Sequence, residues 1–235
     1  MPAQAIILAA GRGQRLRPLT DHTPKPLLSV GRWRLIEWHL RALARAGVRE
    51  VVINTAWLEP QFPAALGQGE AHGVHIHWSH EARDHGAALE TAGGIRKALP
   101  LLDDVFWVVS GDVFIPDMVF NVPARHYLGD SDASACLWMV PNAPHHPSGD
   151  FGWAGEGQPL HLEAPRMTWA SVGVFEARAF RDLPLGQAHA LRPVLDEALT
   201  QARLLGRTLP GRWVDVGTEE RLAQARAIAD AEPDR

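Results

Sequence analysis

The sequence predicts an α/β protein built on a parallel sheet that is covered by helices. Two observations predict this fold. Short apolar runs typical of buried strands alternate with stretches of helical spacing through the first half of the chain. The first of these runs, Ala5–Ala9, passes directly into a glycine-rich, basic loop, and ligands of open parallel sheets bind beyond the carboxyl ends of such strands.

The elements follow one another in a strand-helix-strand rhythm. In the first half, strands are expected at Ala5–Ala9, Val51–Asn54, Val74–Trp78 and Val105–Val109, with helices at Leu35–Ala46 and Thr91–Leu99. Gly47 is expected just past the end of the first helix, a position that glycine favours. In the second half, the pattern predicts strands at Ala133–Val140, Phe151–Trp153, Ser171–Phe175 and Arg212–Val216, a loop at Pro141–Pro147, and helices at Arg192–Ala202 and Thr218–Ala231. The end, Glu232–Arg235, is expected to be frayed.

The composition fits a single soluble domain. The chain has 235 residues, of which 46% are hydrophobic and 21% charged. A net charge of −4 argues against nucleic acid or an anionic membrane as a partner, because both require a basic face. No apolar run approaches the roughly 20 residues of a membrane span, and a secretory signal is lacking, so the cytoplasm is expected. The one cysteine, Cys136, is expected to be a small buried apolar residue.

The loop after the first strand predicts a phosphate-binding site. Gly11 and Gly13 allow a tight turn whose N–H groups approach an anion, while Arg15 and Lys25 add positive charge. The dinucleotide and P-loop motifs do not match, because Leu16 stands where the third glycine would be and no G-K-[ST] triplet occurs. An ordinary strand-to-helix turn is the alternative, and the closely spaced basic residues favour the phosphate site.

Two aspartates close apolar strands further along the chain. Asp112 follows Ser110-Gly111 at the end of one strand, and Asp215 lies between valines just before the last helix. Either could be a turn or capping residue. If both converge on the phosphate loop, they suit Mg²⁺, a hard cation that carboxylates and substrate phosphates bind together.

Other residues indicate ligand or metal binding less strongly. The small residues around Thr91 and Gly93 let a base or a sugar approach the backbone, although Thr91 could simply cap a helix. His75 and His77 alternate with apolar residues on a predicted strand, so we interpret them as a solvated strand face rather than a metal site.

Taken together, the motifs resemble those of the sugar-phosphate nucleotidyltransferases. The resemblance is carried by Leu8-Ala9-Ala10-Gly11, Gly13, Arg15-Leu16, Pro18-Leu19-Thr20, Pro24-Lys25-Pro26-Leu27, Leu89, Thr91, Gly93, Gly111-Asp112, Trp213, Asp215 and Gly217-Thr218, in the order of the family. It covers nearly the whole chain. Within this family the chain looks most like the short N-acetylmuramate α-1-phosphate uridylyltransferases of cell-wall (peptidoglycan) sugar recycling, which share its length.

This resemblance implies a fold and a set of site residues. The fold would be a Rossmann-like nucleotidyltransferase sandwich, with a mostly parallel central sheet and helices on both faces. Residues 1–130 would mainly bind nucleotide, residues 131–217 mainly sugar, and residues 218–235 would form a C-terminal helix. Nucleotide would be bound by Ala9, Gly11, Arg12, Gly13, Lys25, Glu81, Thr91 and Gly93; sugar by Ser110, Asp150 and Glu163; and Mg²⁺ by Asp112 and Asp215.

Three positions depart from the pattern of these short relatives. Ser110 stands where asparagine is expected, Ala92 replaces a glycine, and Arg212 replaces a histidine. Ser110 could remove a hydrogen bond to the sugar, and Ala92 could narrow a pocket. The identity of the sugar is therefore less defined than the reaction.

The resulting hypothesis is the Mg²⁺-dependent transfer of a nucleotidyl group from an NTP to a sugar 1-phosphate, which gives an NDP-sugar and pyrophosphate. UTP is the expected donor and N-acetylmuramate 1-phosphate the expected acceptor, with Arg15 and Lys25 as catalytic residues. Guanylyl transfer to mannose 1-phosphate and thymidylyl or uridylyl transfer to glucose 1-phosphate remain alternatives, as does a phosphocholine cytidylyltransferase. A catalytically silent nucleotide-sugar binder is a further alternative, against which Lys25 and both aspartates argue. A monomer or a small homo-oligomer is expected.

Overall fold

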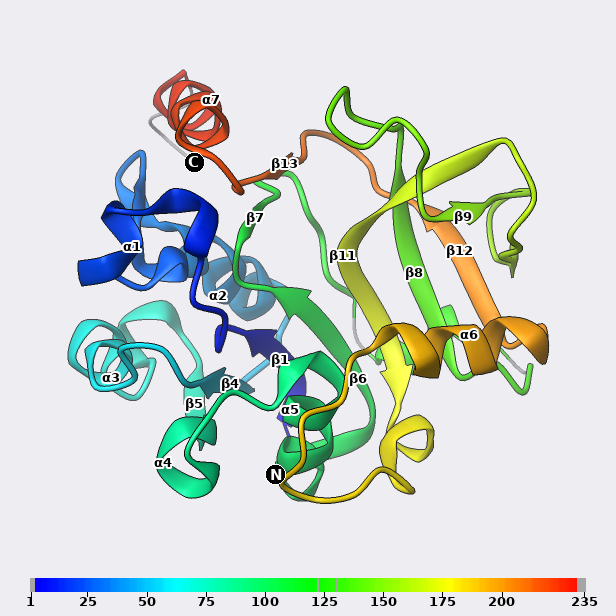
Figure 1. Ribbon diagram of the computed structural model, residues 1–235, viewed down its shortest axis with the longest axis horizontal. Coiled ribbons are helices and arrows are strands. Elements are labelled where there is room, and N and C mark those ends of the chain that lie inside the picture. Colours follow the sequence, from blue (N-terminus) through cyan, green and yellow to red (C-terminus); the bar gives the residue numbers. More distant parts are fainter. Residues whose placement is uncertain (1–2, 122, 130, 232–235) are drawn as a thin grey trace.

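A computed structural model describes residues 3–121, 123–129 and 131–231. One sheet crosses this part of the chain in the strand order β10-β12-β8-β11-β6-β1-β4-β5, with β9 paired to β11 (Figure 1). Its strands are β1 (Ala3–Leu8), β4 (Glu50–Thr55), β5 (His75–His80), β6 (Leu102–Ser110), β8 (Ala135–Val140), β9 (Phe151–Gly152), β10 (Gln158–Pro159), β11 (Arg166–Glu176) and β12 (Leu204–Thr208). Strands β5, β4, β1 and β6 pair in parallel, which confirms the predicted parallel sheet.

The second half of the chain extends the same sheet. Strand β11 is antiparallel to both β6 and β8, whereas β12 returns parallel to β8. The prediction of a strand at Ser171–Phe175 was too short, because β11 begins at Arg166, where its first residues pair with β9. Strand β12 was missed, and so were several two-residue strands that make too short a pattern to detect.

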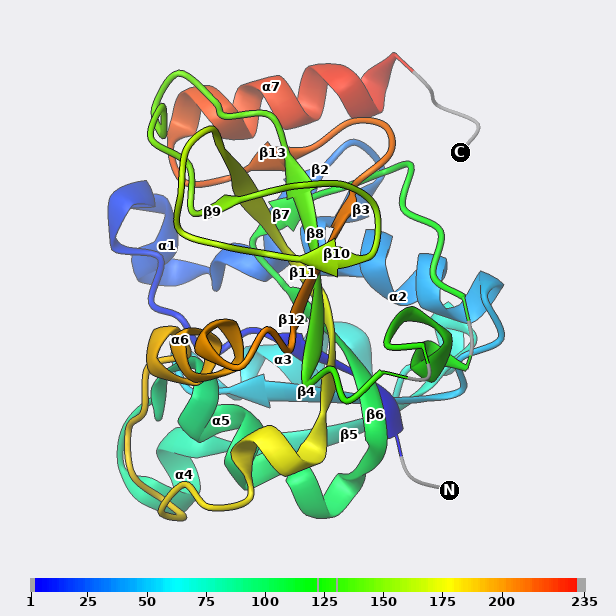
Figure 2. The same ribbon diagram turned by 90° about the vertical axis from the view of Figure 1, so that its right-hand side faces the viewer.

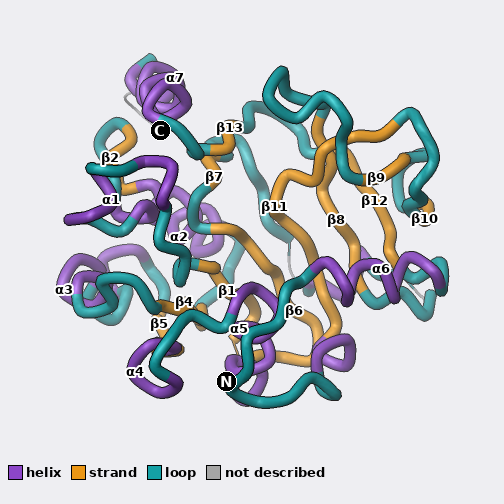
Figure 3. The backbone as a smooth tube through the Cα atoms, viewed as in Figure 1, coloured by secondary structure: helices purple, strands orange, loops and turns teal. Residues whose placement is uncertain are grey.

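Helices cover both faces of the sheet (Figures 1 and 2). Figure 3 separates helices, strands and loops by colour. The helices are α1 (Leu19–His22), α2 (Leu35–Arg45), α3 (Gln61–Leu66), α4 (Glu81–His85), α5 (Glu90–Ala98), α6 (Arg192–Thr200) and α7 (Glu219–Asp230). Gly47, with φ of 89°, follows the end of α2 as predicted.

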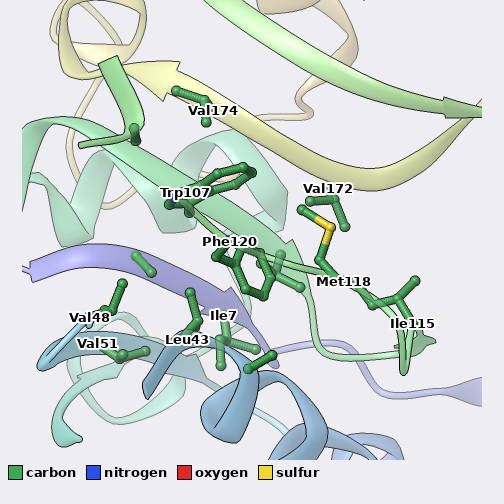
Figure 4. Close-up of a cluster of buried hydrophobic side chains, with 14 of the residues drawn as sticks. Ile7, Leu43, Val48, Val51, Trp107, Ile115, Met118, Phe120, Val172 and Val174 are labelled. Carbon is green, nitrogen blue, oxygen red and sulfur yellow. The ribbon is translucent and has the colours of Figure 1, made fainter. Parts of the chain in front are cut away.

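Alternation along the central strands builds a core on each face. Ile7 and Trp107 face the layer that contains Leu43 of α2 (Figure 4). Their neighbours Ile6 and Val108 point to the opposite face, where α5 and α6 pack. Because both faces of residues 5–7 of β1 and residues 105–109 of β6 are buried, these parts of the strands read as continuous apolar runs in the sequence.

Helix α7 closes one end of the molecule, beside the short paired strands β7 (Val113–Phe114) and β13 (Val214–Asp215) (Figure 2). Thr218 caps this helix by accepting a hydrogen bond from the N–H of Arg221. Leu222 then packs against Phe114 and Val214. A second short pair, β2 (Ser29–Val30) and β3 (Trp33–Arg34), lies next to α7. The predicted frayed end, Glu232–Arg235, lies outside the described residues.

In the described part of the chain, none of the helices has the length and apolar character that crossing a membrane requires. Cys136 is buried in β8, as expected, and burial raises the pKa of its thiol to about 12.

Candidate active site

A cleft of about 490 Å³ lies at the carboxyl ends of β1, β4 and β6. Register explains why distant residues meet there, because Leu8 at the end of β1 pairs with Ser110 of β6 and with Asn54 of β4. Eight residues that the sequence singled out line this cleft: Ala9, Gly11, Gly13, Arg15, Lys25, Thr91, Ser110 and Asp112. The position of this cleft agrees with the rule that ligands gather at this edge of a parallel sheet.

The loop after β1 needs glycine at position 13. Gly13 has a φ of 67°, and a Cβ there would lie 3.0 Å from Cγ2 of Thr20 and 3.3 Å from Cβ of Lys25. The hydroxyl of Thr20 donates to the carbonyl of Gly13 at 2.9 Å, which fixes the turn. Gly11 has no atom within 4 Å of the place where a Cβ would be, so its backbone borders open space.

Lys25 and Asp112 form an ion pair in the cleft. Lys25 Nζ donates to Asp112 Oδ2 at 2.7 Å, and the hydroxyl of Ser110 donates to Asp112 Oδ1 at 2.7 Å. Burial acts to raise the pKa of Asp112, but the charge of Lys25 and the hydrogen bonds from Lys25 and Ser110 lower it further, so the net pKa lies below its usual value. The carboxyl is therefore ionised at neutral pH.

Behind the loop lies a buried chain of hydrogen bonds. The N–H of Ala9 donates to Asn54 Oδ1 at 2.9 Å, and Asn54 Nδ2 donates to Glu81 Oε1 at 2.7 Å. The other oxygen of Glu81 accepts from the N–H of Leu89 at 2.7 Å. Burial raises the pKa of Glu81, although these hydrogen bonds oppose the rise. Glu81 thus lies behind the cleft wall and links the two backbone segments that form it.

The second wall of the cleft begins at α5. Glu90 adopts a φ of 56°, which is unusual for a residue with a side chain, and Thr91 follows it on the cleft wall. Thr91 does not cap the helix, because Leu89 occupies the cap position. Gly93 faces away from the cleft, and its N–H donates to the carbonyl of His189 at 3.1 Å.

Asp215 borders an adjoining cleft of about 590 Å³. The N–H of Val216 donates to the carbonyl of Asp112 at 3.1 Å, so the backbone of Asp112, in the turn between β6 and β7, lies beside the end of β13, the strand that carries Asp215. The Asp215 carboxylate accepts from Arg221 Nη1 at 2.8 Å and lies 3.6 Å from His145 Nε2. Arg15 extends from the cleft of Lys25 to the backbone that follows Asp215, because a Cβ on Gly217 would lie 2.9 Å from its Nη2.

The family model for nucleotidyl transferases matches residues 4–232. The chain belongs to the nucleotidyl transferase family.

Three similar proteins illustrate this relationship. An N-acetylmuramate alpha-1-phosphate uridylyltransferase from Neisseria meningitidis is 45% identical over 97% of this chain and 99% of that protein. A mannose-1-phosphate guanylyltransferase from Mycobacterium tuberculosis is 36% identical over 95% of this chain and 63% of that protein. A crystal structure of a putative glucose-1-phosphate thymidylyltransferase from Bacillus anthracis has a TM-score of 0.76 and 21% identity, covering 97% of this chain and 95% of that one. The last similarity confirms the predicted fold.

The remaining predicted site residues of this nucleotidyl transferase do not line the cleft that holds Lys25. The Arg12 guanidinium lies 4.5 Å from the ring centre of Trp57, whose Nε1 donates to the carbonyl of Thr20 at 2.8 Å. Asp150 accepts from the N–H of Trp169 at 2.8 Å and lies 3.1 Å from His146 Nε2, so it fixes the start of β9 against β11. Glu163 lies on an exposed loop before β11.

Asn54, Arg221 and His145 make polar contacts at the two clefts and were not among the predicted site residues. Asn54 is a polar residue near the carboxyl end of the buried strand β4, a signal similar to the one that indicates Asp112, so it could have been found. Arg221 and His145 could not, because α7 and the loop after β8 approach Asp215 only in the folded chain.

Proposed function

We propose that the chain transfers a uridylyl group from UTP to N-acetylmuramate 1-phosphate, giving the UDP-sugar and pyrophosphate. The observation that carries this proposal is the 45% identity, over nearly the full length of both chains, to an N-acetylmuramate alpha-1-phosphate uridylyltransferase. The cleft supports the reaction, because a glycine loop, a lysine and an ionised carboxylate meet at one edge of the sheet. On this proposal the chain would act in the cytoplasm, in the recycling of peptidoglycan sugars.

The proposed reaction does not require acid–base catalysis by the protein. An oxygen of the sugar phosphate attacks the α-phosphorus of the nucleotide, and the bond from that phosphorus to the bridging oxygen breaks, releasing pyrophosphate. The attacking phosphate has a second pKa of about 6, so it is largely dianionic at neutral pH and needs no general base. Catalysis then consists of alignment and stabilisation of negative charge.

The residues of the cleft suit this task. The N–H groups of Gly11 and Gly13, together with Arg15, would bind the β- and γ-phosphates. Lys25 would stabilise the oxygens around the α-phosphorus, since its Nζ already lies within the cleft beside Asp112. Arg15 also reaches Gly217, on the backbone that follows Asp215.

The carboxylates fit a divalent cation, which members of this family generally use. Asp112 lies in the turn just before β7, and Asp215 lies on β13, the strand paired with β7; each offers two oxygens that a cationic side chain and a hard metal ion can share. We propose that these two residues hold Mg²⁺. Bound there, Mg²⁺ would neutralise part of the charge on the substrate phosphates.

The other residues predicted to bind nucleotide are also given proposed roles. Ala9, Thr91, Arg12, Glu81 and Gly93 would bind or position the nucleotide, mainly within residues 1–130. Arg12 would act through its contact with Trp57, Glu81 through Asn54, and Gly93 through its close packing on residues 187–189.

The sugar would be held mainly by residues 131–217. Ser110 borders the cleft of Lys25, and the loop after β8 carries His145 to the adjoining cleft. Asp150 would contact the sugar from the end of this loop, and Glu163 from the exposed loop before β11. Residues 218–235 would complete the adjoining cleft through Arg221 of α7. The active form would be a monomer or a small homo-oligomer.

The test is a panel of NTPs against the 1-phosphates of N-acetylmuramate, glucose, mannose and glucosamine, with pyrophosphate release measured in the presence of Mg²⁺. UTP with N-acetylmuramate 1-phosphate should give the highest kcat/KM. If GTP with mannose 1-phosphate is preferred, the second candidate, which the 36% identical guanylyltransferase favours, is correct. If nucleotide binds but no pair turns over, the chain is a binder and the proposal fails.

A further inference from the structure

A cluster of imidazole and carboxylate groups lies at the edge of the sheet opposite the candidate active site. It consists of Glu50, the first residue of β4, and His75 and His77 on the neighbouring strand β5. The strands are parallel, and their register pairs Glu50 with His75 and Val52 with His77. Because side chains alternate along a strand, His75 and His77 project from the same face, beside Glu50. The candidate active site lies at the other end of β4, beyond Asn54.

The three side chains converge on one point. His75 Nδ1 lies 3.0 Å from Glu50 Oε2, and His77 Nε2 lies 2.7 Å from the same oxygen. One ligand atom from each residue can be chosen so that all three lie within 4.8 Å of one another. The two imidazole rings are nearly perpendicular, at 86°, with centres 4.7 Å apart. Two ring nitrogens and one carboxylate oxygen therefore face a common space.

The charge of the cluster also suits a cation. The hydrogen bond from His77 lowers the pKa of Glu50; burial opposes this effect, and His75 adds to it, so the carboxyl is ionised at neutral pH. His75, with 53% of its side chain exposed, and His77, with 28%, remain accessible to an ion from solvent. The hydrogens that bridge the rings to Glu50 can be released when a metal replaces them.

In place of the solvated strand face that the sequence indicated for His75 and His77, we propose that these two residues and Glu50 bind a divalent transition metal ion of the zinc type. Two imidazoles and one carboxylate are a known zinc ligand set, with bonds of about 2.0–2.2 Å and a water molecule in the fourth position. Mg²⁺ does not suit this set, because it prefers oxygen ligands. The present separations of 2.7 and 3.0 Å from the carboxylate oxygen are shorter than the about 3.3 Å between ligand atoms of a tetrahedral site, so a small rotation of the side chains admits the ion.

The ion would stabilise the fold rather than take part in catalysis. Strand β5 is the last strand of the main sheet and has a neighbour on one side, β4. An ion held by both strands would join this edge strand to the sheet at the end where their pairing begins. Since it binds the folded chain only, it would raise the free energy of unfolding with metal concentration.

The experiment is a titration of the full chain with Co²⁺, a spectroscopic substitute for Zn²⁺, in excess Mg²⁺ to saturate the proposed catalytic carboxylates. We expect one Co²⁺ per chain with the visible absorption of a four-coordinate ion, which Zn²⁺ abolishes by competition. Glu50→Gln, His75→Ala and His77→Ala should each weaken binding by about tenfold or more. Zn²⁺ should raise the Tm of the unchanged chain and not that of His77→Ala.

A matched control is His126→Ala, which removes an exposed histidine elsewhere in the chain. It should bind Co²⁺ as the unchanged chain does. Glu50→Gln keeps the shape of the side chain, so its nucleotidyl transfer with Mg²⁺ should be unaffected and will show that the protein is folded. The proposal is overturned if the unchanged chain binds no Co²⁺ under these conditions, or if the three variants bind it as tightly as the His126→Ala control.

Discussion

Lys25 Nζ lies 2.7 Å from Asp112 Oδ2, so the proposed phosphate-binding cation and the proposed metal-binding carboxylate are bound to each other in this structure. The charge of Lys25 and its hydrogen bond hold the pKa of Asp112 below its usual value, although burial acts to raise it. Binding of substrates then requires an exchange of partners, in which phosphate oxygens approach Lys25 and a cation approaches Asp112. If the proposed function is correct, the pair holds two charged groups of the site in place before the substrates arrive.

Removing either proposed metal-binding carboxylate should abolish most of the activity. Asp112→Asn and Asp215→Asn should each lower kcat by about 10²–10⁴, because charge stabilisation of the transition state is lost. Pyrophosphate release measures the effect. Asp84→Asn is a matched control, since Asp84 forms a pair with Lys97 at the same 2.7 Å distance on the surface. Near-normal turnover in both Asp112→Asn and Asp215→Asn contradicts the assignment.

The conformation of Gly13 should be essential for nucleotide binding. In Gly13→Ala, the added methyl meets Thr20 and Lys25, and the backbone conformation itself costs about 1–2 kcal/mol. We expect KM for the NTP to rise about tenfold or more, because Lys25 and the loop N–H groups shift.

Gly47→Ala is the control for this change. Gly47 also has a positive φ, of 89°, but no atom lies within 4 Å of its added Cβ. It should lose stability to denaturant without any change in KM. If Gly13→Ala and Gly47→Ala have the same small effect on KM, the loop does not bind the nucleotide.

Glu81 should act through the backbone of the nucleotide loop. Glu81→Gln replaces an oxygen that accepts from Asn54 or Leu89 with an amide that cannot accept, so one buried donor loses its partner. KM for the NTP should rise by about three- to tenfold with a smaller change in kcat, because Ala9 is positioned through Asn54. Steady-state kinetics at saturating sugar phosphate separates the two parameters. A fall in kcat with unchanged KM shows that Glu81 has another role.

How far the site could be predicted depends on where its residues lie in the fold. The loop from Gly11 to Arg15 and Asp112 follow apolar strands, and strand ends meet at one edge of a parallel sheet, so a pattern local in sequence predicts a contact in space. The position of Arg221, which donates to Asp215, does not follow from this rule. Arg221 lies on α7, whose position depends on the packing of Leu222 against Phe114, and side-chain packing over such distances leaves no periodic signal.

The sequence also predicts the location of residues buried beneath the cleft wall better than it predicts their contacts. Glu81 was expected to touch the nucleotide, but the structure buries it beneath the cleft wall. Its sequence neighbours indicate that it follows a strand, and they do not indicate which way its side chain turns. A polar residue at a strand end is therefore predictable as part of the site region, whereas its contact with substrate is not.

The folded chain should lose stability in mildly acidic solution because of His39. This residue is buried, and its Nε2 lies 2.9 Å from the carbonyl of Val113, next to Asp112; since a carbonyl can only accept, Nε2 carries the hydrogen. Burial lowers the pKa of His39 to about 4, against the opposing effects of this hydrogen bond and of the charge of Asp112.

The sign of the pH effect follows from this lowered pKa. The unfolded chain, in which the pKa of the histidine is about 6.5, binds the proton more readily than the folded chain. The contribution of His39 to the free energy of unfolding is therefore fully present above about pH 6.5 and is lost as pH falls from there towards 4. The expected loss is about 2 kcal/mol between pH 7 and pH 5. Urea unfolding at both pH values measures the loss.

His39→Gln is the control: it keeps a donor for Val113 but does not titrate, so its free energy of unfolding should fall by about 2 kcal/mol less over the same range. His72, whose pKa burial also lowers, remains in both proteins and cancels in the comparison. An equal pH dependence in the two proteins excludes His39 as its source.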